Sequence, residues 1–305
     1  MPHERIPHAQ DQDVGGRRGP LDGNEKALIR PHLDRFRKEG PDFKDFTDLY
    51  SPQDIGADVV AVENKREKKK DYSAEQEERE FYATILEMVL TEFGNAWLPG
   101  TLTRTSEYDD FERGTDMVME VTDDAGTIHR IGLDVVSGKK STDDKIIRIT
   151  DQLFRGDFQA LKYFESDVDE TRGTTDMPKA IIGTDRDDDI AQLARLFLSH
   201  IAAKEAKNTT RMNAIRESIA EHELGKQLRF ELIFQMEHYP VYLERALEKR
   251  PELRNEIRAR IEELDRLGGI FREHDKQKGP GKVELSRAGN GVLNVLALRL
   301  SPSVS

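Results

Sequence analysis

Two aspartates, Asp116 and Asp134, stand where the chain could perform metal-ion or acid–base chemistry. They lie near the two ends of RGTDMVMEVTDDAGTIHRIGLDVVSGKK, residues 113–140, which reads as two strands joined by a tight turn. The DAG sequence at 124–126 suits a three-residue hairpin loop with glycine in the left-handed position. Counting outward from that loop places Asp116 opposite Asp134 on the neighbouring strand.

The other side chains of the hairpin support this register. Asp123 would pair with Thr127, and Glu120 would face Arg130, an opposite-charge pair of the stabilising kind. A slip of one residue would mix the polar and apolar faces, so we expect the register to be well determined. The residues predicted to share one apolar face are Met117, Met119, Val121, Ile131, Leu133 and Val135.

Facing carboxylates in such a pair have Cβ atoms about 4.5–5.5 Å apart, and like charges so placed are destabilising. Three arrangements would relieve the repulsion. The pair could bind a divalent cation through its carboxylate oxygens. It could share one proton, with a raised pKa. It could also splay into water at the strand ends, and the spacing leaves all three open.

The elements around the hairpin predict an α+β fold, with a central mixed β-sheet flanked by helices and a helical C-terminal part. A capping-box pattern begins the first helix, and Gly-Asn ends it. The expected elements are a helix from Ser73 to Gly94-Asn95, a strand in TLTRTS (101–106), the hairpin, a helix from Ser141 or Thr142 to about Phe164, and a buried strand in KAIIGT (179–184).

The whole chain divides into four parts in this interpretation. Residues 1–70 form an N-terminal extension whose first 24 residues are expected to be disordered. A helix over 25–39 is interrupted by Pro31, and 41–70 is irregular. The parts that follow are the core (71–185), a helical region (186–273) with a helix over 251–267 ended by Gly268-Gly269, and a C-terminal tail (274–305) in which VLNVLALRL forms a last strand.

The order helix–strand–strand–strand–helix–strand resembles the PD-(D/E)xK nuclease superfamily, which has the restriction-endonuclease-like fold. The resemblance covers roughly residues 73–185. In that family an aspartate on the second strand binds Mg²⁺, and Asp116 in RGTD matches it. The acid of the acid-x-lysine motif on the third strand would be Asp134 in GLDVV. A glutamate on the first helix often assists, and Glu80 and Glu87 are the candidates.

The lysine of the motif is displaced, because Val136 stands where the family has it. The amine could come from Lys139 or Lys140 just past the strand, or from Lys145 on the next helix. Some family members carry the lysine on that helix, and others have lost both lysine and activity.

If active, such a protein would be a hydrolase that cleaves nucleic-acid phosphodiesters with Mg²⁺ or Mn²⁺, and Asp116 and Asp134 would be the metal ligands. DNA or RNA would be the partner, and its backbone would meet the three lysines together with Arg104, Arg113 and Arg148. The alternative is a catalytically inactive scaffold on the same core, with a protein partner on its C-terminal helices.

Composition limits the partners and the setting. The 305 residues carry a formal net charge of −12, so the surface as a whole does not suit a polyanion, although a local basic groove is compatible. No stretch approaches the roughly 18 apolar residues of a membrane span. The N-terminus lacks the apolar region of a secretory signal, and the absence of cysteine fits a reducing compartment. We therefore expect a cytoplasmic protein.

Three further patterns receive ordinary structural interpretations. The charge run ENKREKKK (63–70) is read as a solvated linker, with a nucleic-acid-binding arm as the alternative. His129, on the apolar side of the hairpin, is read as a core histidine with satisfied hydrogen bonds. The acidic residues 185–189 are read as favouring the start of a helix near Asp189.

Overall fold

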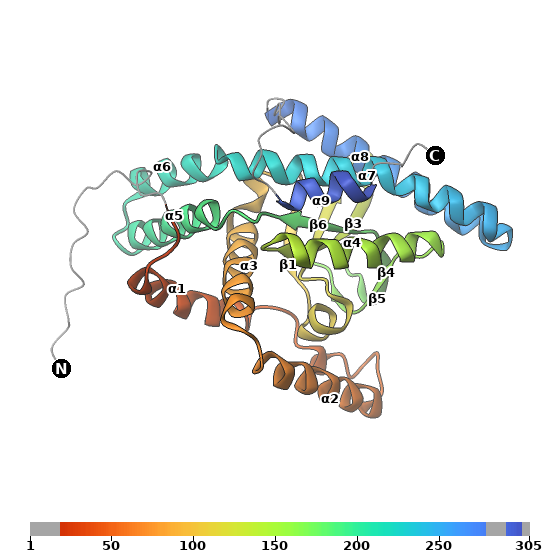
Figure 1. The fold of residues 1–305 in the computed structure, drawn as a ribbon, viewed down its shortest axis with the longest axis horizontal. Coiled ribbons are helices and arrows are strands. Elements are labelled where there is room, and N and C mark those ends of the chain that lie inside the picture. The colour runs from red at the N-terminus through yellow and green to blue at the C-terminus, as the bar shows by residue number, and fades with distance from the viewer. Residues whose placement is uncertain (1–18, 279–290, 301–305) are drawn as a thin grey trace.

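The computed structural model describes residues 19–278 and 291–300, without the side chains of residues 140 and 141. It confirms a mixed α+β fold (Figure 1). A four-stranded mixed sheet has the order β1-β2-β3-β6, and a second sheet pairs β4 with β5. Disorder was predicted for residues 1–24, of which 1–18 lie outside the described residues. It was wrong for 19–24, where Leu21 is buried and a helix begins at Gly23.

The predicted hairpin and its register are confirmed. Asp123 N donates to Thr127 O at 2.9 Å, and Gly126 has φ +82°. Arg130 Nε donates to Glu120 Oε1 at 2.9 Å. The first three strands are antiparallel, and the fourth runs parallel to the third. These strands are β1 (Thr101–Arg104), β2 (Met117–Thr122), β3 (Ile128–Val136) and β6 (Lys179–Gly183).

The prediction for residues 141–177 was partly wrong. The helix begins earlier and ends ten residues sooner than predicted, and a hairpin follows where a helix end and a loop were expected. Gly156, with φ +80°, turns the chain just after the helix. Leu161 and Phe164 then pack with Val118 and Met177 in a small cluster of buried residues, which stabilises strands here. The elements are α4 (Lys139–Phe154), with Gly138 as its N-cap, β4 (Gln159–Glu165) and β5 (Arg172–Met177).

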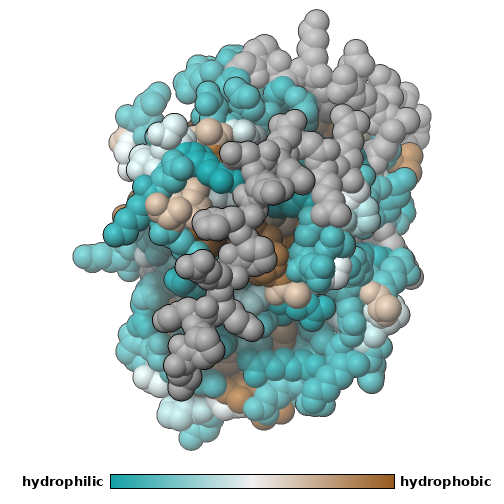
Figure 2. All heavy atoms as spheres, turned by 90° about the vertical axis from the view of Figure 1, so that its left-hand side faces the viewer, coloured by the Kyte–Doolittle hydropathy of each residue, from teal (hydrophilic) through white to brown (hydrophobic). Residues whose placement is uncertain are grey.

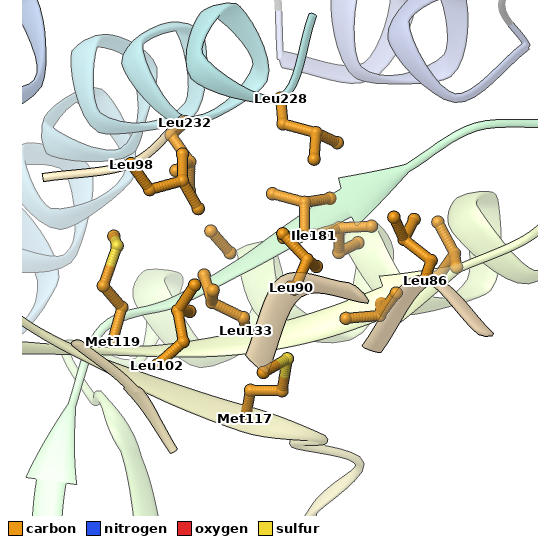
Figure 3. Packing of buried hydrophobic residues seen from close by; sticks show 14 of the residues in the cluster. Leu86, Leu90, Leu98, Leu102, Met117, Met119, Leu133, Ile181, Leu228 and Leu232 are labelled. Carbon is orange, nitrogen blue, oxygen red and sulfur yellow. The ribbon is translucent and has the colours of Figure 1, made fainter. Parts of the chain in front are cut away.

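The main core lies between the sheet, α3 (Ala74–Phe93) and α7 (Glu223–Lys249) (Figure 3). Ser73 and Gln76 form the predicted capping box at the start of α3. Leu86 and Leu90 of this helix reach the apolar face of the hairpin, and Leu228 and Leu232 of α7 close the core from another side. The amphipathic pattern of α3 thus fixes this long helix against the strands that carry Asp116 and Asp134.

The N-terminal region is more ordered than predicted. Pro31 lies inside α1 (Gly23–Phe36) without ending it, and most of the segment expected to be irregular is α2 (Pro52–Lys69). Ser51 caps α2 and Pro52 occupies its first turn, an arrangement that favours a helix start. The charge run is therefore helical, and its basic residues lie at the C-terminal end, where the helix dipole favours cations.

Helices make up the described C-terminal part, as predicted, but two details were wrong. One helix continues through Gly268-Gly269, because Leu264, Leu267 and Phe271 keep a buried stripe across the glycines. The segment 291–300 is a helix that packs on α4, not a strand. The helices are α5 (Asp187–Glu205), α6 (Thr209–Ala220), α7, α8 (Arg254–Lys278) and α9 (Gly291–Leu300).

The helices α1 and α2 lie near one end of α3, and the long helices α7 and α8 lie near its other end (Figure 1). The end of the molecule that carries α1, α5 and α6 is largely hydrophilic, with small separate hydrophobic patches (Figure 2). Within residues 19–278 and 291–300, no helix is both long enough and apolar enough to cross a membrane.

Candidate functional site

A cleft of about 1100 Å³ opens between the N-terminal helices and the sheet. One side is formed by α3, and the other by the ends of α1 and α2 together with a short π-helix, η3 (Asp109–Arg113). The end of β3 and the first turns of α4 complete it. Four ionisable side chains from four different segments line it together: Glu87, Asp110, Asp116 and Lys145.

Asp116 is held at the end of the hairpin by its own side chain. Its Oδ2 accepts a hydrogen bond from Val135 N at 2.6 Å, and its backbone N–H donates to Leu133 O at 2.9 Å. Burial raises the pKa of Asp116 well above its usual value, and the nearby charges of Asp134 and Glu87 raise it further. The carboxyl group is therefore bonded into the strand end and does not splay into water.

Asp134 is fully buried, with 0% of its surface exposed, and two lysines neutralise it. Lys145 Nζ donates to Oδ1, and Lys179 Nζ lies 3.0 Å from Oδ2. Burial alone would raise the pKa of Asp134, but the two ammonium groups outweigh it and lower the pKa. Asp134 is thus an ionised carboxylate beside Asp116, whose carboxyl group is harder to ionise.

Of the three lysines that the sequence offered as the displaced amine, Lys145 is the one that the described structure brings to the carboxylates. It extends from α4 to Asp134, and 23% of its side chain is exposed. Burial lowers its pKa, but Asp134 and Asp116 outweigh that effect and raise it, so the amine stays charged. Lys139 is exposed and its side chain packs beside Gly291 of α9. The side chain of Lys140 lies outside the described residues.

The helix glutamate nearest Asp116 is Glu87, not Glu80. Glu87 is buried, and burial followed by the charge of Asp110 raises its pKa to about 8. Glu80 lines the same cleft but pairs with Lys69 of α2, with Nζ and Oε1 2.7 Å apart. The sequence offered both glutamates, and the fold separates them by their depth in the cleft.

Two residues of the site were missed from the sequence. Asp110 lies on η3 and lines the cleft with Asp116, and burial raises its pKa. Lys179 opens the buried strand β6 and also donates to the carbonyls of Gly114 and Arg113, the latter at 3.1 Å. Lys179 could have been found from the sequence, because it is a lysine at the start of an otherwise apolar strand.

Among the predicted arginines, only Arg104 belongs to the cleft lining. Its guanidinium donates to Phe36 O at 3.2 Å and lies 3.8 Å from Asp110 Oδ2. Arg113 and Arg148 are exposed and lie outside the lining.

The donor chemistry of the cleft suits a divalent cation. Carboxylate oxygens are the ligands that Mg²⁺ and Mn²⁺ prefer. Burial raises the pKa values of Glu87, Asp110 and Asp116, and neighbouring acids raise those of Glu87 and Asp116 further. A cation would relieve the repulsion at Glu87 and Asp116. In the part of the chain that is described, no three acidic or histidine side chains already form a group that could hold a metal ion.

Two other polar clusters are structural. His129 is buried between Glu263 and Asp123, with ring nitrogens 2.9 and 3.1 Å from their carboxylate oxygens, which confirms the core histidine. The acidic run lies at the start of α5, which begins at Asp187, two residues earlier than predicted.

No protein-family model, curated protein or solved structure matches this chain. The chemistry of the cleft is therefore inferred from its own residues.

Proposed function

We propose that this chain is a metal-dependent nuclease with a restriction-endonuclease-like core, and that it hydrolyses nucleic-acid phosphodiesters in the cleft. The order of α3, β1, β2, β3, α4 and β6 agrees with the core order of that superfamily. The sheet order β1-β2-β3-β6 is also consistent with it. The hairpin of β4 and β5 is then an insertion before the last core strand.

The observation that carries the proposal is the position of Lys145. Val136 occupies the position on the third strand where the family has a lysine. Helix α4 supplies an amine in its place. That amine binds Asp134 and lies close enough to Asp116 for its charge to lower the pKa of this acid. Phosphodiester hydrolysis by this mechanism needs a charged amine beside both carboxylates. Val136 cannot provide one.

In this mechanism Asp116, Glu87 and Asp110 would hold Mg²⁺ or Mn²⁺. A bound metal ion supplies a more acidic water and stabilises negative charge on the phosphate. Lys145 donates hydrogen bonds toward the phosphate oxygens, where negative charge develops. Asp134 orients the Lys145 amine, and Lys179 holds Asp134 in place. Asp134 could join the metal ligands only by releasing one of its two lysines.

An inactive scaffold is the second candidate, and one observation favours it. Both oxygens of Asp134 face lysine amines, so one predicted metal ligand is already neutralised. In this alternative the acidic cleft would bind neither metal nor nucleic acid.

The test combines metal binding with cleavage. Mn²⁺ binding would be measured by calorimetry for the wild type and for Asp116→Asn, which keeps an oxygen for Val135 N–H. Cleavage of end-labelled single-stranded and duplex oligonucleotides would be followed with Mg²⁺, Mn²⁺ or EDTA. Asp265→Asn, at an exposed position of α8, is the matched control.

We expect metal-dependent cleavage and Mn²⁺ binding that Asp116→Asn abolishes and Asp265→Asn retains. If the folded wild type neither binds Mn²⁺ nor cleaves either substrate, the scaffold is the correct interpretation.

A further inference from the structure

The carboxylates lie inside a concavity that the N-terminal helices help to build. The wall opposite α3 includes Arg37 and Lys38 just after α1, and Arg66 and Lys69 at the end of α2. A substrate must therefore enter the protein to reach Asp116.

A second pocket of about 290 Å³ continues the cleft beneath α1 and α2. The two share four cationic residues and Glu107, so the cleft and this pocket form one groove; the cationic residues are Arg37, Lys38, Arg66 and Arg104. The second pocket adds Lys44 to these cations.

Basic side chains outnumber acidic ones along this second pocket, in a protein whose net charge is −12. Arg66 is already paired with Glu107, whereas within the described residues no ion pair engages Lys38 or Lys44. Lys38 and Lys44 can therefore attract phosphates at this end of the groove, whereas acidic side chains slightly outnumber basic ones along the cleft itself. The charge run at 63–70, for which a nucleic-acid-binding arm was the alternative interpretation, thus contributes Arg66 and Lys69 to the groove.

Two aromatic side chains face this groove. Tyr72 follows α2 and is half-buried in the cleft lining, and no ring pair or hydroxyl hydrogen bond occupies it within the described residues. Phe111 of η3 also lines the cleft, and Lys69 Nζ lies 4.4 Å from its ring centroid. Cations along a groove with aromatic rings between them are the arrangement by which proteins bind single strands, because bases stack on the rings.

We propose that the cleft takes one nucleic-acid strand, whose backbone follows the groove past Arg104 and Lys38 and one of whose bases stacks on Tyr72. This inference rests on the proposed function and narrows its substrate to single-stranded nucleic acid. An intact duplex would have to separate its strands, or present a frayed end, before a phosphate reached Asp116.

Binding can be tested apart from cleavage. The probes are a fluorescein-labelled 12-nucleotide strand and a blunt duplex of the same sequence, followed by fluorescence anisotropy with Ca²⁺ as the oxygen-binding cation. The variants are Tyr72→Ala, Tyr72→Phe and Lys38→Ala. Leu298→Ala, at an exposed position of α9 outside the groove, is the control.

We expect the strand to bind at least tenfold more tightly than the duplex. Tyr72→Ala should weaken strand binding about 5- to 150-fold, the effect of losing one stacked base, while Tyr72→Phe stays within about twofold. Lys38→Ala should reduce the slope of log K against log salt by about 0.7, as for one phosphate contact on a single strand. Leu298→Ala should match the wild type.

Equal or tighter duplex binding, no effect of Tyr72→Ala, or no binding of either probe would overturn this inference. The proposed function fails separately. Duplex cleavage with weak strand binding would leave the nuclease intact and remove the single-strand inference. Strand binding that depends on Tyr72, without cleavage in Mg²⁺ or Mn²⁺, would leave the inference intact and remove the nuclease.

Discussion

The two lysines that neutralise Asp134 should differ in what their loss does. We predict that Lys145→Met impairs cleavage far more than folding, and that Lys179→Met does the reverse. Lys179 is 8% exposed and Lys145 is 23% exposed, and both contact the same buried carboxylate. Methionine keeps an unbranched apolar side chain at each position and removes only the amine.

The magnitudes follow from the contacts of each amine. Removing one partner of a buried ion pair costs about 3–5 kcal/mol when the other charge is left alone. Here one lysine remains, so Lys145→Met should cost about 1–3 kcal/mol. Lys179→Met also removes hydrogen bonds to the carbonyls of Arg113 and Gly114, each worth about 0.5–1.5 kcal/mol. It should therefore lower the free energy of unfolding by about 2–6 kcal/mol.

Cleavage should rank the variants in the opposite order. Lys145 lines the cleft and Lys179 does not. Loss of a positioned catalytic group typically lowers the rate about 10²- to 10⁴-fold, which we expect for Lys145→Met. Lys179→Met should lose less than about tenfold at a temperature where it is fully folded.

Urea unfolding followed by circular dichroism gives the stabilities, and single-turnover cleavage gives the rates. Lys276→Met, at an exposed position of α8, is the control for loss of a lysine. If Lys145→Met is the less stable variant, or if both variants lose cleavage equally, the division of roles between the two amines is wrong.

Two further predictions concern α7. Gly225→Ala should lower the free energy of unfolding by about 1–3 kcal/mol, seen as a lower urea midpoint, because a Cβ would lie 2.4 Å from Cδ1 of the fully buried Trp97. His222 caps the helix by accepting a hydrogen bond from Leu224 N, and burial lowers its pKa to about 4. Because the unfolded chain takes up that proton near pH 6.5, the stability due to His222 is complete above this pH and is lost as pH falls toward 4. His222→Asn, a cap that does not titrate, should flatten the dependence of the urea midpoint on pH between 7 and 4.5, and an unchanged slope would contradict this.

The hairpin was predictable because its determinants are local. A glycine loop fixes the turn, and strict alternation fixes which side chains face the core, so the register to Glu120 and Arg130 followed from the sequence. The start of α3 was predictable for the same reason, since Ser73 and Gln76 cap it within four residues.

The missed elements depend on contacts distant in sequence. The strand β4 is stabilised by packing of Leu161 and Phe164 on residues of β2 and β5, which a helical pattern cannot reveal. The charge run of α2 looked like a linker because two of its partners, Glu107 and Glu112, lie 41 and 47 residues away in the sequence. Local propensity gave no indication of either.

The same distinction between local and distant determinants applies to the candidate site. Asp116, Asp134 and Lys145 could be named because they follow the strands and the helix around one hairpin. Glu80 and Glu87 could not be distinguished, since seven residues make nearly two helical turns and place both on one face of α3. Lys179 and the wall of the cleft needed the tertiary structure, because no short spacing links them to the hairpin. Asp110 lies only six residues before Asp116, but that spacing does not reveal that η3 places it in the cleft lining.

The acids of the cleft lower the free energy of unfolding, and the contacts in the described structure do not offset that loss. Asp134 is neutralised by two lysines, so its charge is explained by structure alone. Burial raises the pKa values of Glu87, Asp110 and Asp116, and neighbouring acids raise those of Glu87 and Asp116 further, which means that folding opposes their ionisation. Asparagine at position 116 would keep the hydrogen bond from Val135 and remove a charge. A sequence selected only for stability would accept that exchange, whereas one that binds a cation needs the carboxylate. This is why we place the function of the chain in the cleft rather than on its charged helices.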